Sequence, residues 1–392
     1  MKEENKHIYR ESDGGVYVHV AVCRSKCIYC DFYSVVCRRD FDWNRYSDAM
    51  VEELSKRRSE LNGMRNVTLY IGGGTPSLMP VGVLSEMVSR MREIIIDFIS
   101  PDGEIIETTM EVNPDDVTEE RATLWRESGI DRISMGVQSF CDDELKTIGR
   151  RHDSARAVEA YRILSKVFGN VSLDMMFGLP GQTLSSLRST ISEFIRLRPR
   201  HISAYSLMYE ERTALTRLRD AGKIGEADDD LSQRMFEEIN RELERAGYRR
   251  YEISNYALPG YESKHNSSYW QGKPYIGIGP SAHSYDGARR RSWNVADISQ
   301  YVDRVEKGEN CSTDECLTLS ELIEENIMTR LRTSDGLAVE DFRLSFGDSE
   351  TEKLMEKAKP LVDNDFLKIE DGCIRLTDKG VMISDEIIVE LF

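Results

Sequence analysis

The chain has 392 residues, a formal net charge of −17 at pH 7 and 40% hydrophobic residues. This length suffices for two or three domains, or for one large barrel with an appendage. The acidic balance argues against nonspecific nucleic-acid binding, which requires basic patches, and no run of about 18 apolar residues would span a membrane. The first fourteen residues are charged and mixed, unlike a targeting peptide, and are expected to form a flexible tail. We therefore expect a soluble, cytoplasmic protein that binds no nucleic acid.

The first predicted element is a buried strand at 16–20, where apolar residues alternate along the chain. The loop that follows carries Cys23, Cys27 and Cys30 in a C-x3-C-x2-C pattern. Three cysteines suit a four-iron cluster with one iron open to another ligand, whereas a structural zinc site takes four protein ligands. The spacing alone leaves two alternatives, which are a zinc site completed by His19 and three buried cysteines without a metal. Disulfides are not expected, because eight cysteines in 392 residues is a low density.

The same order of strand, loop and helix then recurs along the chain. Helices are predicted at 43–61, 81–95, 118–127, 154–167 and 183–197, and strands at 67–71, 106–112, 132–137, 171–176 and 201–207. Six strand–helix units of about 30–40 residues imply an all-parallel sheet with right-handed crossovers. Six units rather than eight predict an α/β fold of the open, partial (β/α)6 barrel type, whose gap would admit a large substrate.

Polar residues and glycines fall at or near the C-terminal ends of these predicted strands. They are the cysteine loop, the Gly72-Gly-Gly-Thr-Pro76 turn, Glu111, Gln138 and Asp174. In barrels of this topology, ligands bind at that rim. The glycine turn would let the backbone approach a ligand and offer N–H groups to it, although it matches neither a P-loop nor a dinucleotide fingerprint. Each feature alone is compatible with a structural role, so it is their shared position that indicates a site.

Beyond the barrel, a charged helix is predicted at 228–246 and a strand at 251–256. The segment 264–270, Lys-His-Asn-Ser-Ser-Tyr-Trp, brings a histidine, a tyrosine and a tryptophan together. These residues could bind a flat aromatic ligand, because imidazole ligates iron and aromatic rings stack. An aromatic corner of the core with a hydrogen-bonded histidine is the alternative.

The last third of the chain changes character. Helices are predicted at 317–331 and at 350–359, the latter stopped by Pro360, followed by a hairpin at 366–376 and a final helix at 377–392. This order resembles a small winged-helix unit. Acidic residues on the hairpin and the last helix favour packing or partner binding over DNA binding.

Taken together, these motifs resemble those of the radical S-adenosylmethionine (SAM) family. Within it, the chain is most similar to the oxygen-independent coproporphyrinogen III oxidase-like group, and there to the HemW branch of haem chaperones. The matching runs are the cysteine motif, the 72–76 turn, Glu111-x-Asn-Pro114, Gly136–Phe140, Asp174–Thr183, His201–Ser206, Tyr251–Asn255 and His265–Trp270. They extend from Tyr17 to about Leu337, which is most of the chain.

The resemblance implies roles for individual residues. Cys23, Cys27 and Cys30 would hold a [4Fe–4S] cluster whose open iron takes SAM. Tyr17 would lie beside the cluster. The residues implied to contact or complete the SAM pocket are Tyr29, Gly73, Gly74, Thr75, Glu111, Gln138, Arg150 and Asp174. Asp and Glu suit a cationic sulfonium ligand, and Arg suits a carboxylate. His265 is the first candidate to contact haem iron.

Two features separate the branches of this group. The oxidase carries a fourth cysteine two residues after the third, where this chain has Phe32, and the 265–270 motif is associated with the chaperone branch. We therefore expect a protein that binds haem and delivers it to a client haem protein, such as a cytochrome or respiratory enzyme, with peripheral membrane association through that client. The alternative is an oxidase that decarboxylates coproporphyrinogen III. Whether the chain is an enzyme is left open.

The expected domain organisation follows from these assignments. It comprises a tail at 1–14, a radical SAM barrel at 15–210, an extension with the histidine motif at 211–310, and a winged-helix-like domain at 311–392.

Overall fold

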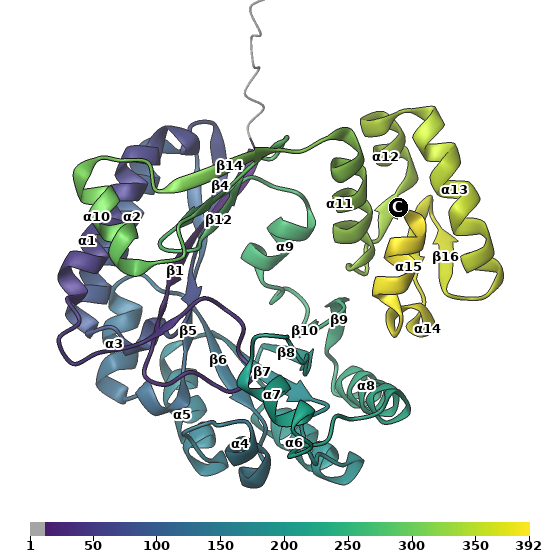
Figure 1. Ribbon diagram of the computed structural model, residues 1–392, viewed down its shortest axis with the longest axis horizontal. Coiled ribbons are helices and arrows are strands. Elements are labelled where there is room, and N and C mark those ends of the chain that lie inside the picture. Colours follow the sequence, from purple (N-terminus) through teal and green to yellow (C-terminus); the bar gives the residue numbers. More distant parts are fainter. Residues whose placement is uncertain (1–11) are drawn as a thin grey trace, which may run out of the picture.

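The computed structural model describes residues 12–392 and is built on one 12-stranded sheet (Figure 1). Six of its strands are neighbours in chain order and run parallel. They are β1 (Ser12–Val20), β4 (Met64–Gly73), β5 (Glu104–Val112), β6 (Arg132–Gln138), β7 (Asn170–Phe177) and β8 (His201–Ser206). The predicted partial (β/α)6 barrel is therefore confirmed. Most of the predicted tail at 1–14 lies outside the described residues, and residues 12–14 belong to β1.

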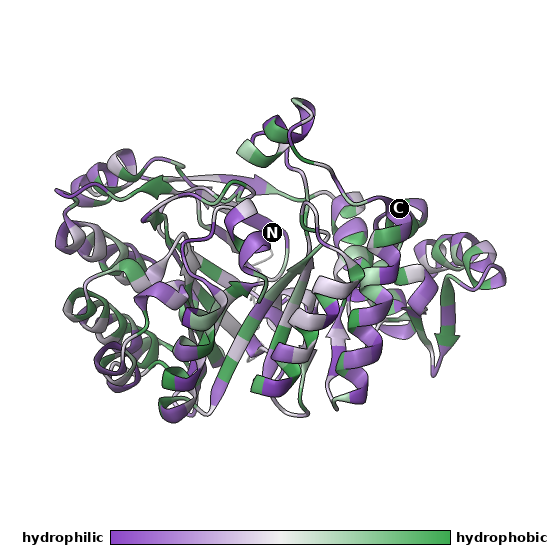
Figure 2. Cartoon of the chain, turned by 90° about the horizontal axis from the view of Figure 1, so that it is seen from below, coloured by the Kyte–Doolittle hydropathy of each residue, from purple (hydrophilic) through white to green (hydrophobic). Residues whose placement is uncertain are grey.

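The crossover helices cover the outer face of this sheet (Figure 1). They are α1 (Trp43–Arg57), α2 (Val81–Phe98), α3 (Glu119–Glu127), α5 (Ser154–Val167) and α6 (Leu184–Leu197), with the short α4 (Asp142–Thr147) between β6 and α5. The starts of α1, α3, α5 and α6 follow from the sequence, because the side chains of Asp42, Thr118, Asp153 and Thr183 each accept a hydrogen bond from a first-turn backbone N–H. Apolar residues line the strands and polar residues lie on the outward faces of the helices (Figure 2).

Further strands extend the sheet at both edges. Next to β1 lie β11 (Tyr275–Ile278), which is parallel to it, and the antiparallel β12 (His283–Tyr285), β13 (Arg290–Asn294) and β14 (Ser312–Cys316). Beyond β8 lie the antiparallel β10 (Asn255–Ala257) and β9 (Arg249–Glu252), so the single strand predicted at 251–256 was wrong. The helices of this region are α7 (Ala214–Asp220), α8 (Asp229–Arg245), α9 (Lys264–Trp270) and α10 (Ile298–Lys307).

The segment at 211–310 shares its hydrophobic core with the barrel, since Met235, Ile276 and Tyr301 belong to the same buried cluster as Val16 and Leu69. The α9 helix lies on the inner side of the sheet, against β1, β4 and β5. Within residues 12–392, no helix combines the length and apolar character needed to cross a membrane.

The C-terminal unit has a three-stranded sheet and a hydrophobic core of its own. Its elements are α11 (Leu319–Leu331), β15 (Leu337–Ala338), α12 (Val339–Phe346), α13 (Asp348–Asp363), β16 (Leu367–Glu370), β17 (Cys373–Leu376), α14 (Asp378–Val381) and α15 (Ser384–Leu391). The predicted hairpin is confirmed, and both turn residues, Asp371 and Gly372, have positive φ, as a type I′ turn requires. Two helix predictions were wrong: α13 continues past Pro360 to Asp363, and the last helix is split into two.

Candidate functional site

A large cavity opens at the C-terminal ends of the parallel strands. Its volume is about 1430 Å³, and its walls come from the barrel, the cysteine loop, α9 and α11. Every residue predicted to belong to the site lines this one cavity: Tyr17, Cys23, Cys27, Tyr29, Cys30, Gly73, Gly74, Thr75, Glu111, Gln138, Arg150, Asp174 and His265. The structure therefore brings all of these residues together, and their roles as cluster, SAM and haem ligands stay predictions.

The cysteine loop begins at β2 (Val22–Cys23), which pairs with β3 (Val35–Val36). Cys23, Cys27 and Cys30 are free thiols. Burial raises the pKa of Cys30, and the charges of Cys27 and Cys23 raise it further. The three thiols therefore lie near one another. In residues 12–392, no three His, Cys, Asp or Glu side chains are grouped as ligands of a single metal ion. An iron–sulfur cubane makes a different demand, because each cysteine binds its own iron, and three free thiols on one cavity wall fit that group.

Hydrogen bonds connect two of these thiols through the strand ends. Thr75 Oγ1 donates to Cys23 Sγ at 3.5 Å and accepts from Asn113 Nδ2 at 3.3 Å. Arg150 donates to Asn113 Oδ1 at 2.7 Å and to Cys27 Sγ at 3.6 Å. Donors aimed at sulfur stabilise thiolates, which are the metal-binding form of cysteine. Asn113 was part of a motif in the sequence but had no assigned role, and its position one residue after β5 was the available signal.

The zinc alternative relied on His19 as the fourth ligand. In the structure both of its ring nitrogens already have partners, the Tyr17 hydroxyl at 3.0 Å and the Tyr33 carbonyl oxygen at 2.9 Å. His19 is also buried, and burial lowers its pKa. The ring therefore orients Tyr17 toward the cavity wall and positions the cysteine loop through Tyr33.

The glycine turn after β4 is held by internal hydrogen bonds. The N–H groups of Gly73, Gly74 and Thr75 donate to Glu111 Oε2 at 3.1 Å, Val20 O at 2.8 Å and Val22 O at 2.9 Å. The expectation that this turn offers N–H groups to a ligand was therefore wrong, and its carbonyl oxygens are the groups that suit a ligand amine. Glycine is required at 74, because a Cβ there would lie within 2.8 Å of three backbone atoms.

Two carboxylates lie in the barrel interior, where burial and the charge of Asp174 contribute to the raised pKa of Glu111. Glu111 on β5 accepts from the Tyr70 hydroxyl at 2.9 Å, and Asp174 on β7 accepts from Ser134 Oγ at 3.1 Å. Burial raises the pKa of Glu111 to about 7 and also raises the pKa of Asp174. A cationic ligand would reverse both shifts by favouring the charged carboxylates, so the pair suits a sulfonium or an ammonium group.

Gln138 and Tyr29 complete this wall. Gln138 ends β6 with a φ of +71°, which is uncommon for a residue other than glycine, and lies at a register shift against β7. Tyr29 packs with Ile28 onto a separate apolar cluster that includes Met176 and Leu215, and burial raises its pKa. The cysteine loop is thus anchored to the barrel on the side away from the glycine turn.

His265 lies at the start of α9 and is almost fully buried. Both ring nitrogens are hydrogen-bonded, Nδ1 to Thr68 Oγ1 at 2.7 Å and Nε2 to the Tyr269 hydroxyl at 2.8 Å. The ring also stacks on Tyr70. Burial lowers its pKa to about 3. This arrangement corresponds to the alternative of a hydrogen-bonded core histidine, and iron ligation by His265 would require the loss of one of these bonds.

A third histidine on the cavity wall, after His19 and His265, was not among the predicted site residues. His283 on β12 is exposed, stacks against Trp293 at 6.1 Å between ring centroids, and has no hydrogen-bonded ring nitrogen within residues 12–392. Only a weak signal marked it in the sequence, because this histidine follows a glycine-rich segment away from the 265–270 motif.

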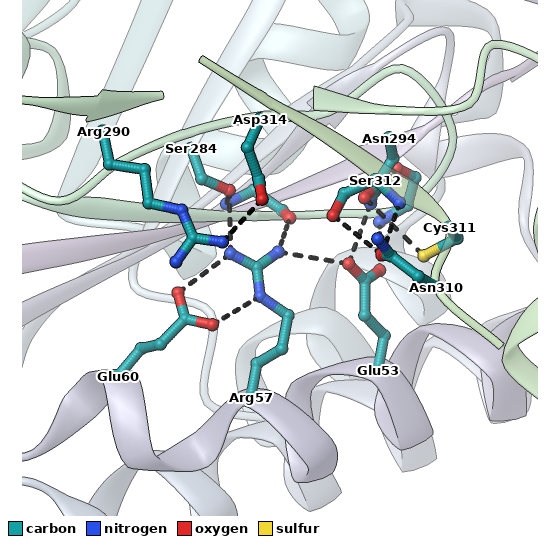
Figure 3. Close-up of polar contacts among 12 residues, drawn as sticks. Glu53, Arg57, Glu60, Ser284, Arg290, Asn294, Asn310, Cys311, Ser312 and Asp314 are labelled. Atoms are coloured by element: carbon teal, nitrogen blue, oxygen red, sulfur yellow. Dashed lines mark hydrogen bonds and ion pairs between the residues drawn. The ribbon is translucent and has the colours of Figure 1, made fainter. Parts of the chain in front are cut away.

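A buried network of charged and polar groups fixes the strands that carry His283 (Figure 3). Arg57 on α1 donates to Gly277 O at 2.9 Å and to Ser284 Oγ at 3.0 Å. Glu53, one turn earlier, accepts from Gly279 N at 3.0 Å and from Asn294 Nδ2 at 2.8 Å. The residues bonded to this pair therefore include the direct chain neighbours of both His283 and Trp293.

Comparison with known proteins assigns the family. Residues 17–194 match the radical SAM superfamily, and residues 317–383 match the HemN C-terminal domain. The heme chaperone HemW of Bacillus subtilis (strain 168) is 32% identical over 373 residues, which cover 95% of this chain and 97% of that protein. This chain belongs to the HemW family.

Other members of the HemW family and one solved structure agree with this assignment. The heme chaperone HemW of Escherichia coli (strain K12) is 36% identical over 269 residues, 68% of this chain and 69% of that protein. Coproporphyrinogen III oxidase (HemN) from Escherichia coli, described as a radical SAM enzyme, superposes with a TM-score of 0.81 at 22% identity, over 97% of this chain and 90% of that one. That likeness establishes the fold. Membership of the radical SAM superfamily implies a [4Fe–4S] cluster and SAM as cofactors.

Proposed function

We propose that this chain is a haem chaperone, which binds haem beside a [4Fe–4S] cluster and SAM and delivers the haem to a client haem protein. The observation that carries the proposal is the single continuous cavity from the cysteine loop to α9, β12 and α11. Typical small-molecule pockets measure about 300–1,000 Å³. A cavity of about 1430 Å³ has room for SAM together with a macrocycle. Two relatives that match over nearly the full length of the chain are named heme chaperones.

In this proposal the cofactors occupy the barrel end of the cavity. Cys23, Cys27 and Cys30 hold the cluster, and the hydrogen bonds of Arg150 and Thr75 stabilise its thiolates. Tyr17 lies beside the cluster, and the residues that surround SAM are Tyr29, Gly73, Gly74, Thr75, Glu111, Gln138, Arg150 and Asp174. When bound, the cluster and SAM supply the potential for radical chemistry. Glu111 and Asp174 contribute negative charge toward the cationic ligand, and the buried tyrosines exclude water.

Haem occupies the other end of the cavity, where aromatic and aliphatic side chains contribute to the walls. The side chains there include Tyr275, Tyr285, Leu322, Met328 and Phe346. His265 and His283 are the two candidates for iron contact, the first from the sequence motif and the second because its ring nitrogens accept no hydrogen bond from residues 12–392. The proposal includes a cytoplasmic location, a cytochrome or respiratory enzyme as the client, and functional boundaries near residues 210 and 310.

The position that separates this proposal from an oxidase is Phe32. It stands two residues after Cys30, where the oxidase resemblance calls for a cysteine, and it is 70% exposed. The next thiol in the chain, Cys37, does not line the cavity, and its Sγ donates to the backbone oxygen of Arg38 at 3.4 Å.

Two anaerobic assays on reconstituted protein test the proposal. In the first, the haem-loaded protein is mixed with an apo-cytochrome, and we expect transfer of haem, followed by absorbance. In the second, the protein is given coproporphyrinogen III, SAM and a reductant, and we expect no protoporphyrinogen. Formation of that product would refute the chaperone assignment, as would a failure to bind haem.

A further inference from the structure

Arg132 is a charged residue inside the barrel that the functions above do not use. It begins β6 and is only 2% exposed. Ser134, two residues later, bonds to Asp174 in the barrel interior, and alternate residues of a strand share a face. Arg132 accordingly lines the cavity together with Ser134 and Asp174.

The guanidinium of Arg132 has no partner in the part of the chain that the structure describes. It forms no hydrogen bond and no ion pair within residues 12–392, and its Nε is fully buried. Arg150, the other arginine of the barrel wall, differs, because it donates to Asn113, to the Gly136 carbonyl oxygen and to Cys27.

The nearby carboxylates are committed to other donors. Glu107 accepts from the backbone N–H groups of Lys264 and His265, at 3.1 and 3.2 Å. Glu111 and Asp174 accept from Tyr70 and Ser134, as described above. All three lie beyond ion-pair distance of Arg132, so they offset its charge only through space.

A buried guanidinium without a bonded partner is costly, since burial removes its hydration and nothing replaces it. Its planar array of five donors matches a carboxylate, which it can bind through two parallel hydrogen bonds. We propose that Arg132 anchors a carboxylate group of a ligand in this cavity. On the function proposed above, the carboxylate belongs either to a porphyrin propionate or to the methionine end of SAM.

The competing explanation is that Arg132 only balances the charge of the interior carboxylates. The two explanations differ in the ligand-free protein. A purely structural cation would stabilise the fold, so that Arg132→Met would lower the unfolding temperature. A cation poised for an absent ligand would not, and Arg132→Met should unfold at or above the wild-type temperature.

The test compares wild-type protein with Arg132→Met and Arg132→Lys, each anaerobically reconstituted with its cluster. The porphyrin probes are ferric protoporphyrin IX and its dimethyl ester, which lacks free carboxylates. The SAM probes are SAM itself and 5′-methylthioadenosine, which lacks the methionine carboxylate. We expect Arg132→Met to weaken the carboxylate-bearing ligand of one pair by about 10- to 100-fold, with the other member unchanged and Arg132→Lys intermediate.

Loss confined to free-acid porphyrin would assign the propionate, and loss confined to SAM would assign the methionine carboxylate. Equal affinities of wild type and Arg132→Met for all four probes would overturn the proposal, as would equal loss for both members of each pair. Wild-type protein that binds SAM but no porphyrin would overturn the haem chaperone function, while the SAM pair would still decide the role of Arg132.

Discussion

Glu53→Ala tests whether the buried network behind the His283 strand stabilises the fold as its geometry implies. Glu53 is 4% exposed and accepts hydrogen bonds from two groups of the β11–β13 region and from two further side chains. These donors are Gly279 N at 3.0 Å, Asn294 Nδ2 at 2.8 Å, the Tyr301 hydroxyl at 2.6 Å and Arg57 Nη1 at 3.2 Å.

When the Glu53 carboxylate is removed, some of its hydrogen-bond donors keep another acceptor and others do not. Arg57 keeps Glu60, and Asn294 Nδ2 keeps the Gly279 carbonyl oxygen at 2.9 Å. The Tyr301 hydroxyl and the Gly279 N–H are left without an acceptor inside the core. Each orphaned buried donor costs about 1–3 kcal/mol, so the two together should lower the free energy of unfolding of Glu53→Ala by about 2–6 kcal/mol. That is a large part of the stability of a typical domain.

Urea unfolding, monitored by circular dichroism, measures this cost. The matched control is Glu52→Ala on the same helix, because Glu52 is exposed and its ion pair with Lys56, at 3.3 Å, lies at the surface. The control should change stability by no more than about 0.5 kcal/mol. If Glu53→Ala and Glu52→Ala unfold at the same urea concentration, the network does not stabilise the strands that carry His283.

Three further predictions concern the cavity. Cys27→Ser should lose the cluster and with it SAM binding, measured as iron and sulfide per chain after anaerobic reconstitution, and iron at the wild-type ratio would contradict the assignment. His265→Ala and His283→Ala should both leave the cluster intact. The variant whose ring contacts the haem iron should bind haem about tenfold or more weakly. An unchanged haem titration removes that histidine from the site. The pKa of Glu111 is raised from an ordinary value of 4.5 to about 7, so the folded protein retains a proton that the unfolded chain releases, and stability falls as pH rises between these values. Glu111→Gln should reduce this loss of stability between about pH 5 and 7.5 by up to about 3 kcal/mol, measured from urea midpoints without ligand. Parallel pH profiles of wild type and variant would show that Glu111 is not the titrating group.

The barrel was predictable because its signals are local. Four of the six parallel strands, β4 to β7, end in or next to a glycine, an acid or an amide, and β1 leads into the cysteine loop. Most crossover helices begin with a capping Asp or Thr. The rim residues could be grouped from the sequence alone, since parallel strands bring their C-terminal ends to one edge.

Contacts between distant parts of the chain could not be predicted in this way. Glu53 and Asn294 are separated by 241 residues, and no local pattern marks them as partners. Arg132 lay inside a predicted strand, but its lack of a partner depends on three strands at once. At Pro360 a local signal was misleading. Proline usually ends a helix, but α13 continues to Asp363, with Leu361 packed in the C-terminal core.

The internal hydrogen bonds of the glycine turn also bear on how tightly a ligand can be held. The N–H groups of Gly73, Gly74 and Thr75 donate to acceptors of the chain itself, so the protein alone orders the strand end. Association then forfeits little conformational entropy at this point, and more of the interaction energy is expressed as affinity. Preorganisation of this kind predicts that the turn has the same protection from amide exchange in the free and SAM-bound states.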